Sequence, residues 1–368
     1  MKFASSPLAM NRRCFLSGLA TTSAALATRP LLGATPSGAA PKIRLGIDNF
    51  AVRAMGWKAP ELIDYAASLK CDTLLISDLD ALGGLEEANL RDIRRRADAA
   101  KIGLYAGSWS ICPTSKAFKK NWGTAEEHVR LGLRVAQTLG SPVFRVVLGT
   151  MEDRKTEGGI KARIADTVTV LKACRADAKA AGVKIAIENH AGDMHSWELR
   201  QLIEDAGRDF VGANIDSGNA VWTLEDPMDV LETLGPVTLC SSLRDSMVWE
   251  TPEGVAVQWT AAGAGLMDWK KYAARWSQLC PQTPIMIETI SGGPRMFPYK
   301  KPEFWAHYDK RPEKLAKFEA LAKRGRQIPA FKAPAGPEGK KATQDFQKAE
   351  IEKSIAYLRQ EIGLGVRA

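Results

Sequence analysis

Eight short apolar runs alternate with segments of helical periodicity between residues 43 and 288. Runs that are apolar nearly throughout are typical of parallel strands buried on both faces. The expected strands are Ile43–Asp48, Thr73–Ser77, Gly103–Gly107, Val143–Leu148, Val183–Glu188, Val211–Asp216, Val237–Leu243 and Ile285–Glu288. The expected helices between them are Ala59–Lys70, Glu87–Lys101, Thr124–Leu139, Gly159–Ala181, Trp197–Asp205, Asp226–Leu234 and Asp268–Leu279.

This alternation constrains the fold class. Eight strand–helix units in about 250 residues are typical of an α/β protein with a (β/α)8 TIM barrel. An open doubly wound sheet is the alternative. It is disfavoured because no glycine-rich phosphate-binding fingerprint follows the first expected strand.

Two segments depart from a plain barrel. Residues 246–265 are too long for a simple loop, and Val255–Trp259 alternates like a strand of a hairpin. The last seventy residues follow the eighth expected strand as an extra piece, in which a Pro/Gly/Lys linker, Ile328–Lys341, leads to an amphipathic helix. We expect a C-terminal helical extension packed on the barrel, with a partner-binding helix as the alternative. Its apolar stripe comprises Phe346, Ile351, Ile355, Leu358 and Ile362.

The first forty residues predict an export signal. They contain no acidic residue, and Arg12-Arg13 precedes an apolar stretch that ends near Ala27. This pattern indicates a twin-arginine signal, cleaved between Ala34 and Ala40, and hence a periplasmic protein. The alternative is a chance arginine pair in a disordered start. The apolar stretch is shorter than the ~20 residues of a membrane span. The expected domains are therefore the signal (1–40), the barrel (41–298) and the extension (299–368).

Charge and cysteine content exclude some functions. The chain carries +9, of which residues 1–40 contribute +4 and residues 299–368 contribute +7, so the barrel carries −2. A nucleic-acid enzyme needs a basic field around its site, so nucleic acid is not an expected partner. No cysteine pair has metal-ligand spacing. The five cysteines after the signal allow one disulfide but imply no disulfide framework.

Three expected strands end on a carboxylate: Glu188, Asp216 and Glu288. The carboxyl ends of barrel strands form the active-site mouth, so these acids should converge there. Three converging carboxylates suit a hard-oxygen metal site or an acid/base pair. Each has a simpler interpretation as well. Glu188 could form a salt bridge inside the barrel, and Asp216 could cap the next segment.

The motifs around these acids resemble a known family. The run I-E-N-H from Ile187, the run N-I-D-S-G-N-A from Asn214 and the run S-S-L-R-D that ends at Asp245 resemble the sugar phosphate isomerase/epimerase family with a xylose isomerase-like barrel. Ala264–Asp268 is similar to the Gly-x-x-Asp segment of that family. The resemblance implies one divalent metal, often manganese, held by Glu, Asp, His and Glu from strands five to eight. Glu188, Asp216 and Glu288 match three of these ligands.

The seventh strand departs from the family pattern. The family usually reads His-x-Lys-Asp there, and Ser242 occupies the place of the histidine. Three carboxylates still suit Mn²⁺, with Mg²⁺ or Co²⁺ as alternatives, whereas Zn²⁺ is disfavoured without an imidazole. Water, His190 or Gln258 are candidates for the open ligand position. Asn219 stands where the family often has a second histidine.

The resemblance further implies an isomerase or epimerase that abstracts a proton next to a sugar carbonyl. Glu188 and Glu288 would be the bases, and His190 and Arg145 would hold sugar hydroxyls. Arg145 could instead pair with one of the acids inside the barrel. The other expected substrate-binding residues are Trp109, Asn219, Gln258 and Arg244.

Export disfavours phosphorylated sugars, so we expect a free sugar or sugar derivative as the substrate. Two other functions remain open: a lyase that cleaves a keto-glycoside by the same enolisation, and a sugar-binding barrel without catalysis. A homo-oligomer is also left open.

Overall fold

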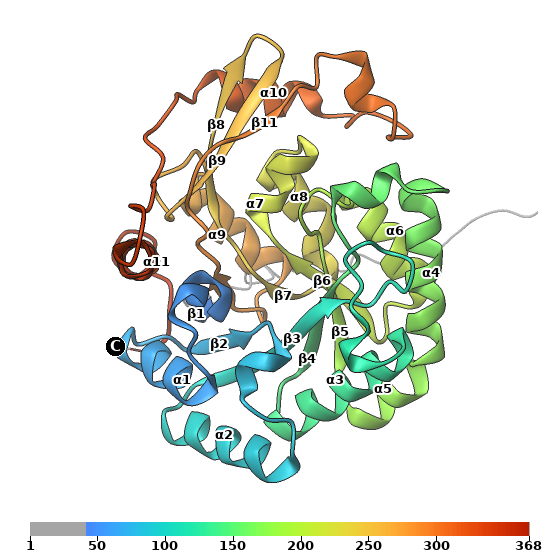
Figure 1. The fold of residues 1–368 in the computed structure, drawn as a ribbon, viewed down its shortest axis with the longest axis vertical. Coiled ribbons are helices and arrows are strands. Elements are labelled where there is room, and N and C mark those ends of the chain that lie inside the picture. Colours follow the sequence, from blue (N-terminus) through green and yellow to red (C-terminus); the bar gives the residue numbers. More distant parts are fainter. Residues whose placement is uncertain (1–41, 368) are drawn as a thin grey trace, which may run out of the picture. The chain divides into compact units, whose positions relative to one another are not determined.

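The computed structural model describes residues 42–367, and these form the expected TIM barrel (Figure 1). One parallel sheet runs in the order β10-β1-β2-β3-β4-β5-β6-β7. A bridge between Leu243 and Ile287 joins the two ends of the sheet, so the barrel is nearly closed. The strands are β1 (Leu45–Asp48), β2 (Thr73–Ile76), β3 (Gly103–Ser110), β4 (Val143–Val147), β5 (Lys184–Glu188), β6 (Val211–Ile215), β7 (Thr238–Ser241) and β10 (Ile285–Ile287).

Helices follow the strands as the periodicity predicts. They are α1 (Ala59–Ser68), α2 (Glu87–Ala99), α3 (Ala125–Leu139), α4 (Gly159–Ala173), α5 (Arg175–Ala181), α6 (Ser196–Ala206), α7 (Ser217–Ala220), α8 (Pro227–Leu234) and α9 (Trp269–Leu279). The single helix expected over Gly159–Ala181 is two helices, because Cys174 has non-helical backbone angles (φ −98°, ψ 7°). The Thr124 side chain caps α3, as its capping-box pattern with Glu127 favours.

The residues around the barrel strands pack tightly against the helices. Gly132 of α3 lies so close to Phe144 of β4 that a Cβ at Gly132 would stand 2.0 Å from the phenyl ring. Both sides of this contact are buried. Close packing of α3 on β4 therefore requires a residue without a side chain at position 132.

The expected hairpin is present after β7. It consists of β8 (Asp245–Thr251) and β9 (Gly254–Thr260), and β11 (Arg295–Phe297) adds a third antiparallel strand. Asp245 holds the base of this hairpin. Its buried carboxylate accepts hydrogen bonds from the backbone N–H groups of Ser246, Gly263, Gly265 and Met267 and from the Trp269 indole.

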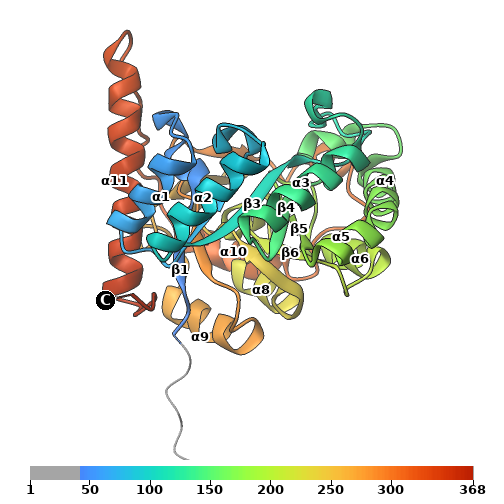
Figure 2. The same cartoon turned by 90° about the horizontal axis from the view of Figure 1, so that it is seen from below.

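The C-terminal segment contains α10 (Leu315–Lys323) and α11 (Glu338–Gln360), and Figure 2 shows α11 running alongside α1. Ile351, Ile355 and Leu358 of α11 join the main core cluster. Gln347 and Gln344 bond the backbone N–H and C=O of Ala54 over 2.9 and 3.0 Å. The linker is shorter than expected because α11 begins at Glu338.

Three further sequence expectations concern the export signal, the cysteines and membrane spans. The export signal lies outside the described residues. The five cysteines within residues 42–367 are free and buried. None of the helices in this part of the chain combines the length and apolar character that crossing a membrane would require.

Candidate functional site

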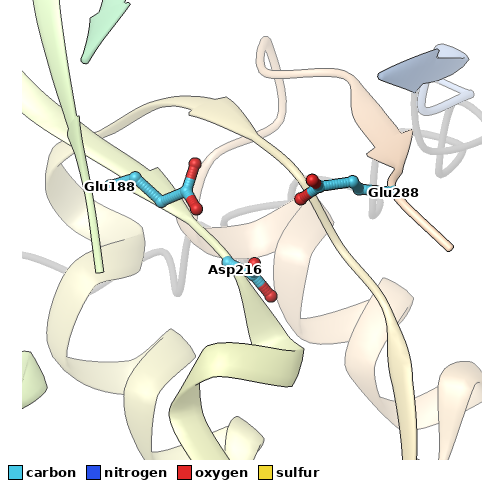
Figure 3. Close-up of side chains that lie close together, drawn as sticks. All are labelled: Glu188, Asp216 and Glu288. Atoms are coloured by element: carbon cyan, nitrogen blue, oxygen red, sulfur yellow. The ribbon is translucent and has the colours of Figure 1, made fainter. Parts of the chain in front are cut away.

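The three strand-end acids meet at the mouth of the barrel. Glu188 ends β5, Asp216 directly follows β6, and Glu288 directly follows β10. One oxygen of each carboxylate lies within 4.8 Å of the others. Glu188 and Glu288 point toward each other, and Asp216 lies between the strands that carry them (Figure 3). All three are buried.

Local hydrogen bonds fix Asp216 in this place. Its Oδ1 accepts the N–H groups of Gly218 and Asn219 over 2.7 and 3.0 Å, so it caps α7 as the simpler interpretation supposed. The Asn189 amide bonds both the N–H and the C=O of Asp216 over 2.9 and 2.8 Å. The second oxygen, Oδ2, is left to face the barrel mouth, where it accepts from Asn219 Nδ2 over 2.6 Å.

A guanidinium group lies between two of the acids. Arg244 Nη2 donates to Glu288 Oε2 over 2.6 Å and also to Asp216 Oδ2. Burial alone would lower the pKa of Arg244, but Asp216, Glu288 and Glu188 together raise it. Arg244 is therefore a permanent positive charge inside the acidic cluster.

A second arginine holds the third acid. Arg145 Nε donates to Glu188 Oε2 over 2.7 Å, so the alternative interpretation of Arg145, as the partner of an acid, is observed. Asn214 and Asn219 donate to the same carboxylate over 2.9 and 3.2 Å. Burial opposes the charge of Arg145, but Glu188 and Asp48 raise its pKa.

A fourth acid, Asp48, ends β1 and was not among the residues predicted for the site. It is buried and accepts hydrogen bonds from Ser77 Oγ over 2.7 Å and from Ser242 Oγ over 3.0 Å. Ser242, in the place of the family histidine, thus bonds an acid from β1. A signal existed, because Asp48 closes the first apolar run as the other three acids close theirs.

Four buried carboxyl groups therefore face two guanidinium groups. Burial raises the pKa of Asp48, Asp216 and Glu288 above their ordinary values. For Glu288 the shift is large, and the charge of Arg244 only partly opposes it. These three carboxyl groups thus accept a proton more readily than free acids do, which suits acid/base chemistry.

A cavity of about 500 Å³ opens onto this cluster. Glu288, Arg244, Arg145, Asn219, His190 and Trp109 are among its lining residues, together with Trp122 and Trp259. Glu188 and Asp216 are not among its lining residues. Five of the six expected substrate-binding residues therefore line one cavity.

His190 presents a defined face to the cavity. Its Nδ1 lies 2.6 Å from the carbonyl of Gly149, which can only accept, so Nδ1 carries the proton and Nε2 remains an acceptor. Burial lowers the pKa of His190, which keeps the ring neutral. The Trp109 ring meets it edge-on at 5.1 Å.

The structure does not bring Gln258 to the cavity. Its amide Nε2 donates to the carbonyl of Pro329 over 2.9 Å, so the side chain ties the hairpin to the C-terminal segment. The alternation of Val255–Trp259 predicts a strand. Whether Gln258 of that strand faces the cavity depends on the packing of the C-terminal segment around Pro329, which is 71 positions away in the sequence.

The three carboxylates could hold a metal ion by their spacing and their hard oxygen donors. Arg244, however, already bonds the facing oxygens of Asp216 and Glu288. A cation between these acids would stand beside the guanidinium charge. With Arg244 in this place, the residues do not fit a metal ion, and we assign no chemical step to one.

Solved structures with a similar fold include sugar epimerases. The crystal structure of a D-psicose 3-epimerase in the presence of D-fructose is similar to this chain, with 15% identity, coverage of 87% of this chain and 100% of the other, and a TM-score of 0.57. D-psicose 3-epimerase from Clostridium cellulolyticum H10 with D-tagatose has 14% identity, covers 84% and 99%, and has a TM-score of 0.52. The IolI protein with a bound zinc atom has 16% identity, covers 84% and 99%, and has a TM-score of 0.53.

These likenesses show the fold. No curated protein matches the chain in a sequence search. The family model of the xylose isomerase-like TIM barrel matches residues 51–301, which is more than half of the chain. The chain therefore belongs to the xylose isomerase-like TIM barrel family.

Proposed function

We propose that this protein is a sugar isomerase or epimerase that moves a proton next to the carbonyl of a non-phosphorylated sugar. One observation carries the proposal: the carboxyl group of Glu288 and the guanidinium group of Arg244 share one wall of the 500 Å³ cavity. A proton acceptor thus stands beside a fixed positive charge. Family membership and the sugar epimerases among the similar structures support the same reaction class.

The proposed reaction begins at Glu288. Its carboxylate takes the proton from the carbon next to the carbonyl, the electron pair of that C–H bond forms a carbon–carbon double bond, and the π pair of the carbonyl moves to its oxygen. Arg244 and Arg145 donate hydrogen bonds to the resulting enediolate oxygens. Return of the proton to the former carbonyl carbon, together with transfer of the hydroxyl proton of the first carbon to the enediolate oxygen, moves the carbonyl by one carbon and gives isomerisation. Return to the opposite face of the same carbon gives epimerisation.

Glu188 is the proposed second base, since it faces Glu288 across the barrel mouth (Figure 3). It is not among the residues that line the cavity and is held by Arg145 and Asn219. His190 Nε2 is placed to accept a sugar hydroxyl, and Trp109 and Trp259 offer ring faces to sugar C–H groups. The resemblance to metal-dependent relatives implies Mn²⁺ between the acids, and that ion would have to displace Arg244.

Hydrogen exchange at carbon tests the proposal. Deuterium should enter D-fructose or D-tagatose from D₂O, followed by NMR, and Glu288→Gln should abolish the exchange while the far-ultraviolet circular dichroism stays unchanged. Glu313→Gln, an exposed acid paired with Lys310, is the matched control and should exchange at the wild-type rate. Absence of exchange into any free or oxidised sugar by folded wild-type protein would contradict an enzyme. Calorimetric sugar binding would then indicate a sugar-binding barrel.

A lyase acting on a keto-glycoside is the second candidate. The same cavity that reaches Glu288 also includes Lys119 and Trp122, which precede α3 and lie well beyond the end of β3 in the chain. This lining extends beyond what the reacting carbons need and suits a second sugar or an aglycone. Release of an aglycone alongside the exchange would favour this candidate over the epimerase.

A further inference from the structure

We propose that Arg244 is the resident cation of the acidic cluster and stands in the place of a divalent metal, so that the protein binds no metal there. Its Nη2 reaches both Asp216 Oδ2 and Glu288 Oε2. These are two of the three acids that could otherwise serve as ligands. A further role of Arg244, as the group that stabilises the enediolate, rests on the proposed function.

The place of Arg244 is built into the fold. Gly218 lies beneath its side chain, and a Cβ there would stand 2.0 Å from Arg244 Cγ and 2.3 Å from Cδ. The Trp259 ring covers the guanidinium carbon at 4.1 Å. Arg244 therefore lies in a slot between a backbone without a side chain and an aromatic ring, which favours one position.

The hairpin holds the wall of this slot. Trp259 of β9 donates its indole N–H to the carbonyl of Gly218 over 2.8 Å. Its other face stacks on Trp222 at 4.4 Å, and Arg295 covers the far side of this stack at 4.4 Å from the Trp222 ring. Gly218 of α7 and Trp259 of β9 thus form the slot of Arg244, and Arg295 of β11 lies one ring further out, on Trp222.

The polar side chains that could otherwise complete a metal site already have hydrogen-bond partners. Ser242 donates to Asp48 in the place where the resemblance leads us to expect a histidine ligand. Gln258 bonds Pro329, and Arg145 already neutralises Glu188. Each acid of the triad thus has a guanidinium partner, and a divalent cation added beside Arg244 would meet like charge.

Metal binding by the full-length protein tests the inference without any substrate. Mass spectrometry should find substoichiometric metal in the wild type, and a chelator should leave its melting temperature unchanged. Arg244→Gln frees the oxygens of Asp216 and Glu288. It should therefore bind one Mn²⁺ per chain, followed by electron paramagnetic resonance, with affinity tighter by on the order of tenfold or more.

Two further variants keep the test decisive. Gly218→Ala retains every charge but pushes Arg244 from its slot, so it should also tighten Mn²⁺ binding, and it decides the matter if Arg244→Gln fails to fold. Arg295→Gln removes the outer cation of the stack without touching the acids and should bind Mn²⁺ as weakly as the wild type.

One metal ion firmly held by each wild-type chain would overturn the inference. So would a gain in Arg295→Gln equal to that in Arg244→Gln, because the effect would then be one of general charge. Absence of sugar exchange in every variant would contradict the proposed function but would leave the metal result unaffected.

Discussion

The hydroxyl of Ser242 donates a 3.0 Å hydrogen bond to Asp48 and thereby joins the end of β7 to the end of β1 across the barrel mouth. Both residues are buried. Asn214 Nδ2 reaches Ser242 Oγ over 3.4 Å and Glu188 over 2.9 Å, so the same network continues to Glu188. The serine thus serves a structural role where the resemblance leads us to expect a metal ligand.

Ser242→Ala should destabilise the protein by about 1–3 kcal/mol, because Asp48 would lose a buried hydrogen-bond donor. Urea unfolding measures this directly. Ser277→Ala is the control, since Ser277 is a half-buried residue of α9 whose hydroxyl donates an exposed hydrogen bond to Ala274 O. Equal stabilities for the two variants would contradict a structural role for Ser242.

The acids and the barrel follow from local sequence pattern, and this explains why they could be predicted. Parallel strands end at one mouth, so an acid that closes an apolar run is placed there by topology alone. Asp48 obeys the same rule and could have been included. Its partner Ser242 could not, because the bond joins residues 194 positions apart and depends on the closure of the barrel.

The position of Arg244 lies beyond sequence reasoning for a different reason. The motif S-S-L-R-D places an arginine near the mouth but does not determine its rotamer. That rotamer depends on the missing Cβ of Gly218 and on the Trp259 ring from an inserted hairpin. Only the assembled fold brings these three residues together.

Gly132→Ala should destabilise the barrel by about 1–3 kcal/mol even though alanine is the better helix former, because the new methyl group would clash with the Phe144 ring. Phe144→Leu in the same chain should recover part of the loss by giving the methyl group space. Thermal or urea unfolding of both single variants and the double variant measures the coupling. Strictly additive losses would show that the two side chains do not compete for the same volume.

Asp245→Asn should loosen the hairpin base and cost about 2–4 kcal/mol, because an amide nitrogen would replace an oxygen that accepts at least two of five hydrogen bonds. Hydrogen exchange at the Gly263 and Gly265 amides should quicken. Asp268→Asn is the matched control, since Asp268 caps α9 from the surface and should cost about 1 kcal/mol or less. Unchanged protection of the two glycine amides would refute the role assigned to Asp245.

His128 should make the folded protein less stable as the pH falls from about 6.5 to about 4. Its Nε2 lies 2.7 Å from Ser108 Oγ inside the protein, and burial lowers the pKa of the ring to about 4. The unfolded chain therefore binds a proton near pH 6.5 that the folded chain takes up only near pH 4. Stability is full above the unfolded value, and about 3 kcal/mol is lost across this window.

Comparison with His128→Gln isolates this contribution, because glutamine can still bond Ser108 but does not titrate. The difference in urea unfolding free energy between wild type and variant should change by about 1.4 kcal/mol per pH unit between pH 6 and pH 4.5, and the other acids and bases cancel in that difference. Above pH 7.5 the difference should be constant. A difference that stays constant at every pH would mean that the His128 pKa is the same in the folded and unfolded chain.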